Sequence, residues 1–170
     1  MEYTKEQIKG VLTSKGYKWF DDHNNKGYDV NIVGIRNSTT DGKVTNHFDD
    51  TITISYKDAD SDWNFQQWPA TTDPGQYWME HPMNTDGCAI LVPGQYRGSH
   101  KIKLHQGKYE ALGQRKPVKV YRDNDRDLEY DTDADTITEG VYGINIHRSN
   151  PYDESTYVNK WSAGCQVFKK

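Results

Sequence analysis

The sequence predicts a mainly β protein that begins with one short helix. Apolar and polar residues alternate in several segments, and a two-residue period is that of a half-buried strand. Residues 51–56 show this pattern, with Ile52, Ile54 and Tyr56 set against threonine and serine. Twelve tyrosines and five tryptophans supply core area that a hydrophobic content of 34% understates. A chain of 170 residues is most simply one domain, so we expect residues 1–170 to form a single domain.

The helix is expected over residues 5–15. Thr4 is suited to cap its N-terminus, and Gln7 stands at the capping-box position three residues later. Gly16 is a natural stop. The apolar residues recur at helical spacing: Ile8, Val11 and Leu12. We expect this amphipathic helix to cover a core rather than to bind a substrate.

The remaining strands are expected where β-branched, aromatic and apolar residues cluster between turn residues. The segments are 28–33, 51–56, 88–92, 118–121, 140–147 and 161–168. The turn Asp41-Gly42 suggests a hairpin between the first two. Residues 63–82 are rich in aromatics and interrupted by prolines, so we expect a long ordered loop with short strands. Its aromatic side chains either fill the core, which we favour, or line a groove for sugar or peptide.

Two acidic stretches contain residues that could bind a metal ion. His47, Asp49 and Asp50 lie close together, but without a third spaced ligand we interpret them as a polar strand start. Aspartates at 123, 125 and 127 have calcium-loop spacing. Leu128 and Ala134 occupy the positions of that loop's glycine and closing glutamate, so we favour a solvated loop. We therefore expect no metal site.

Composition argues against several classes of function. A net charge of −4 and a pI near 5.8 provide no basic surface for nucleic acid. No apolar run approaches the roughly 20 residues of a membrane span, and no secretory segment follows the N-terminus, so we expect the chain to be cytoplasmic as synthesised. Cys88 and Cys165 are interpreted as free thiols.

The candidate catalytic residues lie in the last two β-rich segments. His147 ends one of them, and Cys165 follows Ser162, Ala163 and Gly164 in the other. A cysteine attacks a carbonyl as thiolate, so it needs a base, which His147 supplies. Small residues before it permit a tight turn whose N–H groups converge on an oxyanion. The alternative is that the thiol is a buried core group and the imidazole a strand-end residue.

A histidine followed 18 residues later by the cysteine of Ser-x-Gly-Cys resembles the L,D-transpeptidase catalytic domain of bacterial cell-wall enzymes. The resemblance covers about 30 residues. It implies that Cys165 is the nucleophile and His147 the base, with Ser162 and Gly164 shaping the turn. It also implies a single catalytic-type domain with a β-sandwich-like fold, acting on peptidoglycan stem peptides without a metal or organic cofactor.

Three functions remain open under this resemblance. Hydrolysis of the stem peptide is slightly favoured, in a phage-type lysin released to the cell wall. Cross-linking of two stems is the second. A non-catalytic phage structural or wall-binding module is the third, because Ala163 stands where the family has histidine. Arg148 is expected to favour the thiolate or to grip a substrate carboxylate, unless it is a plain surface arginine, and His105 to support the site.

Overall fold

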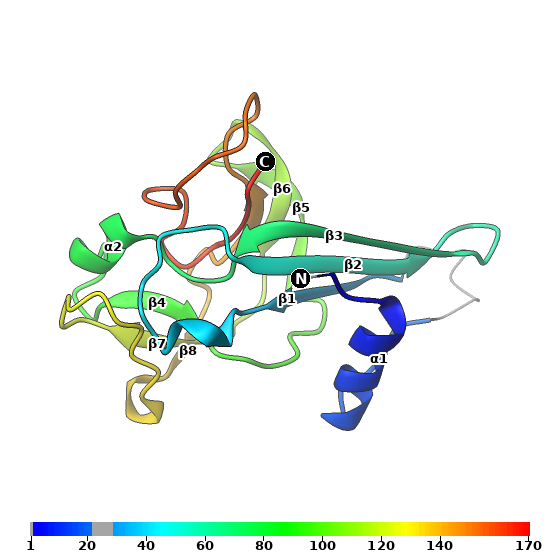
Figure 1. Ribbon diagram of the computed structural model, residues 1–170, viewed down its shortest axis with the longest axis horizontal. Coiled ribbons are helices and arrows are strands. Elements are labelled where there is room, and N and C mark those ends of the chain that lie inside the picture. The colour runs from blue at the N-terminus through cyan, green and yellow to red at the C-terminus, as the bar shows by residue number, and fades with distance from the viewer. Residues whose placement is uncertain (1, 22–28) are drawn as a thin grey trace. The chain divides into compact units, whose positions relative to one another are not determined.

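The computed structural model describes residues 2–21 and 29–170, and its secondary structure is mostly strand (Figure 1). The predicted mainly β, β-sandwich-like fold with a short N-terminal helix is confirmed. The chain divides into two compact units, residues 1–34 with 52–68 and residues 35–51 with 69–170, which are described separately. The expectation of a single domain stays a prediction. None of the described helices is long and apolar enough to cross a membrane.

The first unit joins a helix to three neighbouring strands. Its elements are α1 (Lys5–Ser14), β1 (Asn31–Ile35), β2 (Asp50–Lys57) and β3 (Trp63–Thr71), the strands continuing into the second unit. Thr4 and Gln7 form the predicted capping box. Trp19 packs against Trp63 with ring centroids 5.5 Å apart. The Asn31 side-chain amide exchanges two hydrogen bonds of 2.8 Å with the backbone of Phe20.

The second unit contains two groups of paired strands. Its elements are η1 (Ser38–Thr40), α2 (Gln76–Glu80), β4 (Cys88–Leu91), β5 (His100–His105), β6 (Tyr109–Gln114), β7 (Val118–Asp123), η2 (Ala134–Thr136), β8 (Thr138–Gly140), β9 (Ile146–Arg148) and β10 (Gln166–Phe168). The end of β3 pairs with β10, and the order continues through β9 and β6 to β5. A separate sheet has the order β4-β7-β8 (Figure 1).

Two apolar clusters form the core of this second unit. One contains Ala89, Val118, Val120 and Ile144, and therefore lies on the β4-β7-β8 sheet. The other contains Phe48, Val158 and Val167, with Cys165 packed against it. Each cluster reaches one of the two segments that carry the candidate catalytic residues.

Several expected elements differ from the observed ones. The predicted strand over residues 140–147 is broken, because the chain leaves β8 at Gly140 and Gly143 adopts a left-handed φ of +77° before β9 begins. The predicted strand over 161–168 is reduced to β10, preceded by a turn. Asp41 and Gly42 do form a left-handed turn, but Lys43 bridges to Glu129 instead of closing a hairpin between β1 and β2.

The loop expected over residues 63–82 was partly wrong, because its first half is β3. Pro69 is tolerated there since it needs only to accept a hydrogen bond, which its carbonyl does from the Lys169 N–H at 3.0 Å. Tyr28, at the start of the predicted strand 28–33, lies outside the described residues, and β1 begins at Asn31.

We expect Ile90→Ala to destabilise the protein by about 2–5 kcal/mol, because Ile90 in β4 is fully buried and its truncation leaves a cavity. The matched control is Ile102→Ala in β5, where the side chain is 70% exposed and the change should be within about 0.5 kcal/mol. Urea unfolding measures both values. Equal losses for the two variants would contradict the described core.

Candidate active site

Parallel pairing of β9 with β10 brings the two candidate catalytic segments together. His147 is in register with Val167, and the Gln166 N–H donates to the Asn145 carbonyl at 2.9 Å. Paired residues of parallel strands point to the same face, as do residues two apart in one strand. Cys165 packs against the cluster that contains Val167. The pairing therefore places the two segments side by side, with His147 inside β9 and Cys165 directly before β10.

A tight turn positions Cys165. Ser162 is fully buried, and its hydroxyl donates to the Cys165 carbonyl at 2.8 Å while accepting from the Gly164 N–H at 3.2 Å. Gly164 has φ +119°, and a Cβ there would lie 2.6 Å from the Ala89 carbonyl oxygen. Only glycine fits this close approach. Ser162 and Gly164 thus lie where they shape the turn, as the resemblance implies.

Polar contacts with residues 72–75 hold the turn that precedes Cys165 in place. The Gly75 N–H donates to the Ser162 carbonyl at 2.8 Å, and the Gln166 amide donates to the Thr72 carbonyl at 3.3 Å. Arg36 donates to the same Thr72 carbonyl at 3.3 Å and forms an ion pair of 2.6 Å with Asp73. Burial raises the pKa of Asp73 to about 7, although Arg36 opposes the shift. These contacts are structural support for the turn.

The orientation of the His147 ring is fixed through one nitrogen. Nδ1 lies 2.8 Å from the Arg148 carbonyl oxygen, which can only accept, so Nδ1 carries the proton. The Tyr109 hydroxyl donates to the same carbonyl at 3.1 Å and lies 3.2 Å from Nδ1. His105 stacks on the ring with centroids 4.1 Å apart. Nε2 is left with its lone pair, as a general base requires.

Burial keeps both reacting groups neutral in the resting protein. It lowers the pKa of His147 to about 4, with the neighbouring His105 and Arg148 acting in the same direction. Burial also raises the pKa of the Cys165 thiol, an effect that the nearby Asn145 backbone N–H opposes. The resting pair is therefore thiol and imidazole, not thiolate and imidazolium.

The Cys165 thiol is only half-buried and is oriented by a carbonyl. Sγ donates to the Gly143 carbonyl at 3.4 Å, and within residues 2–21 and 29–170 it makes no hydrogen bond to His147. Burial raises the pKa of Tyr109, a shift that Arg148 opposes. The Tyr109 hydroxyl lies beside the imidazole of His147.

The backbone around the thiol offers two free donors. The N–H groups of Ala163 and Cys165 make no hydrogen bond to any residue that the structure describes. The Gly164 N–H is already taken by the Ser162 hydroxyl. Among the N–H groups of Ala163, Gly164 and Cys165, those of Ala163 and Cys165 are therefore available to hold an oxyanion.

The two residues expected to assist the pair lie beside it. The Arg148 guanidinium lies over the Tyr109 ring, 4.2 Å from its centroid, and donates to the Ser149 carbonyl at 3.4 Å. His105 packs on His147 and approaches the Asn145 amide at 3.2 Å through Nδ1. Arg148 is therefore half-buried against Tyr109, and its role at the site stays a prediction.

Sequence reasoning missed a buried arginine in a cavity beside this turn. The cavity, of about 140 Å³, is lined by Trp78, Met83, Asn84, Gly87, Cys88, Ala89, Arg122, Tyr142, Ile144 and Ala163. Its lining includes Tyr142 and Ile144, the two neighbours of Gly143, whose carbonyl accepts the hydrogen bond from the Cys165 thiol. Arg122 is 8% exposed, lies 4.5 Å from the Tyr142 ring centroid, and has no carboxylate within 4.0 Å among the described residues.

A signal for Arg122 was present in the sequence. The two-residue period that buries Val118 and Val120 in β7 continues to Arg122. The Arg122 guanidinium donates to the Thr138 hydroxyl and the Gly87 carbonyl, each at 3.3 Å, but meets no carboxylate among the described residues, so this buried cation is a candidate ligand for an anion. Cys88, which also lines the cavity, is 4% exposed, and burial raises its pKa to about 12, so it is a core thiol.

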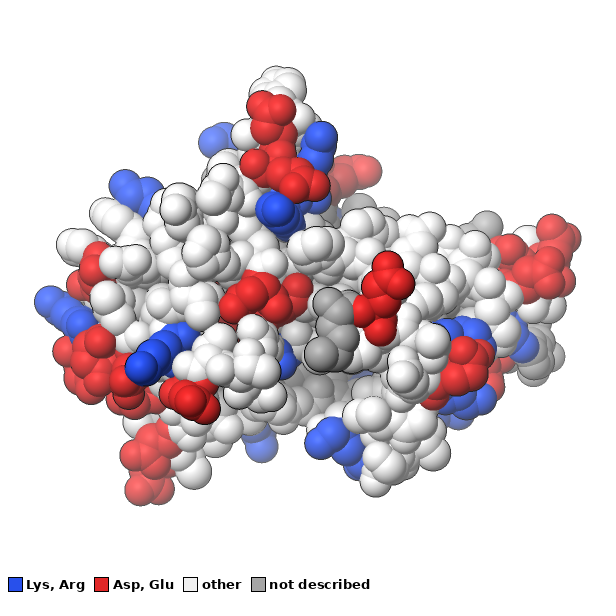
Figure 2. Space-filling view, in the orientation of Figure 1, with Lys and Arg blue, Asp and Glu red and all other residues white. Residues whose placement is uncertain are grey.

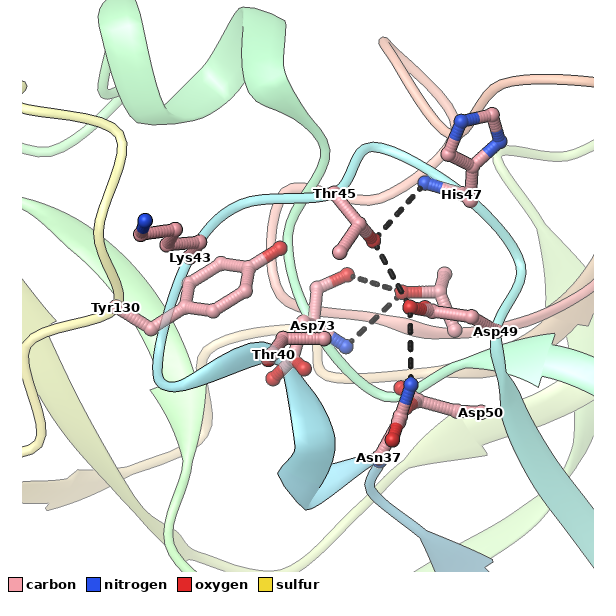
Figure 3. A pocket seen from close by; sticks show the side chains of 10 residues that line it. Asn37, Thr40, Lys43, Thr45, His47, Asp49, Asp50, Asp73 and Tyr130 are labelled. Carbon is pink, nitrogen blue, oxygen red and sulfur yellow. Dashed lines mark hydrogen bonds between the residues drawn. The ribbon is translucent and has the colours of Figure 1, made fainter.

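The side chains of His47, Asp49 and Asp50 do not converge on one point. They line a small pocket of about 10 Å³, enough for one water molecule. Figure 3 shows the His47 ring pointing away from Asp49 and Asp50. Asp50 opens β2 and accepts from the Thr72 N–H at 2.6 Å and the Thr72 hydroxyl at 2.8 Å. The observed geometry agrees with a polar strand start.

No protein-family model, curated protein or solved structure matches the chain.

We expect His147 to make stability depend on pH between about 4 and 6.5. The unfolded imidazole takes up its proton near pH 6.5 and the folded one near 4, so stability falls as pH drops through this window, by about 3 kcal/mol in total. Urea unfolding of His147→Gln across this range should lack that component.

Carboxyl groups with raised pKa, such as Asp73, act in the opposite direction and cancel in the comparison of His147→Gln with the unsubstituted protein. The control His47→Gln changes an exposed ring and keeps His147, so it should retain the original pH dependence. The account fails if His147→Gln and the unsubstituted protein lose stability in parallel.

Proposed function

We propose that this protein carries out cysteine-dependent acyl-enzyme chemistry on peptidoglycan stem peptides, with hydrolysis as the favoured outcome. The observation that supports the proposal is the β9–β10 pairing, which brings the segment of Cys165 beside that of His147, whose Nδ1 is held by a carbonyl. The resemblance of the motif to L,D-transpeptidases supports the substrate class. A lysin-like role at the cell wall follows from this chemistry.

The first step would form the acyl-enzyme. The Cys165 thiol leaves the Gly143 carbonyl by rotating about χ1, and His147 Nε2 takes its proton as sulfur attacks the peptide carbonyl carbon. The imidazolium then gives that proton to the leaving amine as the carbon–nitrogen bond breaks. Catalytic hydrogen bonds are often long before substrate binds, so the resting thiol orientation is compatible with this step.

The oxyanion of the tetrahedral intermediate would be held by the backbone. The Ala163 and Cys165 N–H groups are the available donors, and the buried Ser162 hydroxyl keeps the turn rigid by bonding at both of its ends. Preorganised donors of this kind are each worth about 3–4 kcal/mol of transition-state stabilisation. A side chain at position 163 is not needed for this function.

The fate of the acyl-enzyme determines the biology. Attack by water, with His147 accepting the water proton, releases a shortened stem and regenerates the thiol. Attack by the amine of a second stem gives a cross-link instead. We favour water because the thiol is only half-buried and the Gly143 backbone beside it is exposed, which admits solvent to the acyl carbon.

A non-catalytic wall-binding module is the second candidate. It is favoured by Ala163 at the family's histidine position and by a resting thiol that bonds to Gly143 rather than to the imidazole. In this case the cavity around Arg122 would bind the stem peptide without cutting it.

The deciding experiment incubates the protein with stem tetrapeptides and follows products and protein mass by mass spectrometry. We expect shortened peptides and an acyl adduct on Cys165, both abolished by Cys165→Ala and retained by Cys88→Ala. Dimeric peptides would identify a transpeptidase. The absence of any product from folded protein would contradict both enzyme functions, and binding to intact peptidoglycan would then identify the module.

We further propose that Arg122 binds a free carboxylate of the stem peptide inside the cavity. The cavity is similar in size to an engineered cavity of ~150 Å³ that holds benzene, so it suits one small residue. A buried guanidinium without an acidic partner gains a charge-assisted hydrogen bond when a carboxylate enters.

Arg122→Met should therefore lower kcat/KM for a free-acid substrate by about 10-fold to 100-fold, mainly by raising KM. The same substrate with an amidated terminus should show little difference between the two proteins, which separates carboxylate binding from a general loss of structure. The matched control Arg97→Met removes an exposed arginine outside the cavity lining and should leave kcat/KM unchanged for both substrates. An equal loss on both substrates would overturn the role of Arg122.

A further inference from the structure

Three carboxylates converge where the chain leaves β7. Asp123, Asp125 and Asp131 each present one oxygen, and these oxygens all lie within 4.8 Å of one another. Figure 2 shows acidic side chains gathered at the left edge of the view, where Figure 1 draws the segment that follows β7. Acidic clusters on a surface are common, so proximity alone does not indicate a ligand.

The Asp123 carboxylate provides an independent observation. This side chain is 1% exposed, and its Oδ1 has no hydrogen-bond partner, whereas Oδ2 accepts from the Asp131 N–H at 2.8 Å. A buried carboxylate oxygen without a partner is costly unless a cation or a donor meets it. The unpaired oxygen belongs to the one buried member of the cluster.

No basic side chain that the structure describes compensates this charge. In residues 2–21 and 29–170, no lysine, arginine or histidine nitrogen lies within 4.0 Å of these three carboxylates. The cluster is therefore short of positive charge.

The backbone holds these residues without the expected glycine. Leu128 stands at the position where a calcium loop has glycine, and it adopts the left-handed φ of +65° that this position requires. Its carbonyl accepts from the Val44 N–H at 2.9 Å, and the Tyr130 N–H donates to the Gly42 carbonyl. The sequence-based objection to a calcium loop at position 128 is thus met by the backbone, and the loop is anchored on residues 42–44.

We propose that Asp123, Asp125 and Asp131 bind a divalent cation, and that the cation is Ca²⁺. All three ligands are carboxylate oxygens, the hard donors that Ca²⁺ prefers, and an exposed rim at Asp125 and Asp131 admits the waters that complete six to eight ligands. Zinc and copper are disfavoured because no histidine or thiol takes part. This site is independent of the proposed reaction.

Calorimetric titration of the purified protein with CaCl₂ after treatment with a chelator tests the proposal. We expect one ion per chain with a dissociation constant of about 10⁻⁵ to 10⁻³ M, tighter than for MgCl₂, and a rise in Tm on adding Ca²⁺. Asp125→Asn and Asp131→Asn should each weaken binding about tenfold or more. Both ligands are exposed, so these variants should fold.

The matched control is Asp135→Asn, an exposed aspartate of the same acidic segment outside the cluster, which should alter affinity less than about twofold. Absence of a calorimetric signal and of a Tm shift in the unsubstituted protein would overturn the proposal. So would tighter binding of Mg²⁺ than of Ca²⁺, or several weak sites that Asp135→Asn affects as much as Asp125→Asn.

Discussion

The parallel pairing of β9 with β10 is the constraint on which the candidate site depends. Each strand is only three residues long, so the pairing cannot be stabilised by its own hydrogen bonds alone. Two further hydrogen bonds stabilise it: the Gly75 N–H donates to the Ser162 carbonyl, and the Gln166 amide donates to the Thr72 carbonyl. Arg36 donates to the same Thr72 carbonyl and pairs with Asp73, so a partly buried ion pair supports residues 72–75 and, through them, the turn before Cys165.

Burial determines the chemical state of the site as much as position does. The stacked rings of His105 and His147 exclude water from an imidazole that would otherwise titrate near neutrality, and the Arg148 carbonyl selects its tautomer. A neutral imidazole beside a neutral thiol avoids the cost of a buried ion pair in the resting state. In the proposed reaction, charge would develop only when substrate binds, where the N–H groups of Ala163 and Cys165 are unpaired among the described residues.

The sequence predicted those parts of the fold that depend on local patterns, and missed those that depend on distant contacts. The capping box at Thr4 and Gln7 and the apolar run of β4 are local, and both are found. Pro69 misled because its tolerance depends on Lys169, one hundred residues away along the chain. The break at Gly143 also has no local signal stronger than a glycine in a strand pattern. Cys165 and His147 were proposed from a motif, and their catalytic role stays a prediction. Arg122 was overlooked because the two-residue period of β7 was not followed to a charged residue on its buried face.

The central claim is that β9 presents His147 as a neutral imidazole with its proton on Nδ1 and its Nε2 lone pair available to the thiol. Long-range proton–nitrogen NMR spectra of the histidine-labelled protein at neutral pH test it directly, with His147→Gln identifying the resonance. The account predicts a neutral ring with the proton on Nδ1. A proton on Nε2, or a doubly protonated ring at neutral pH, would contradict it.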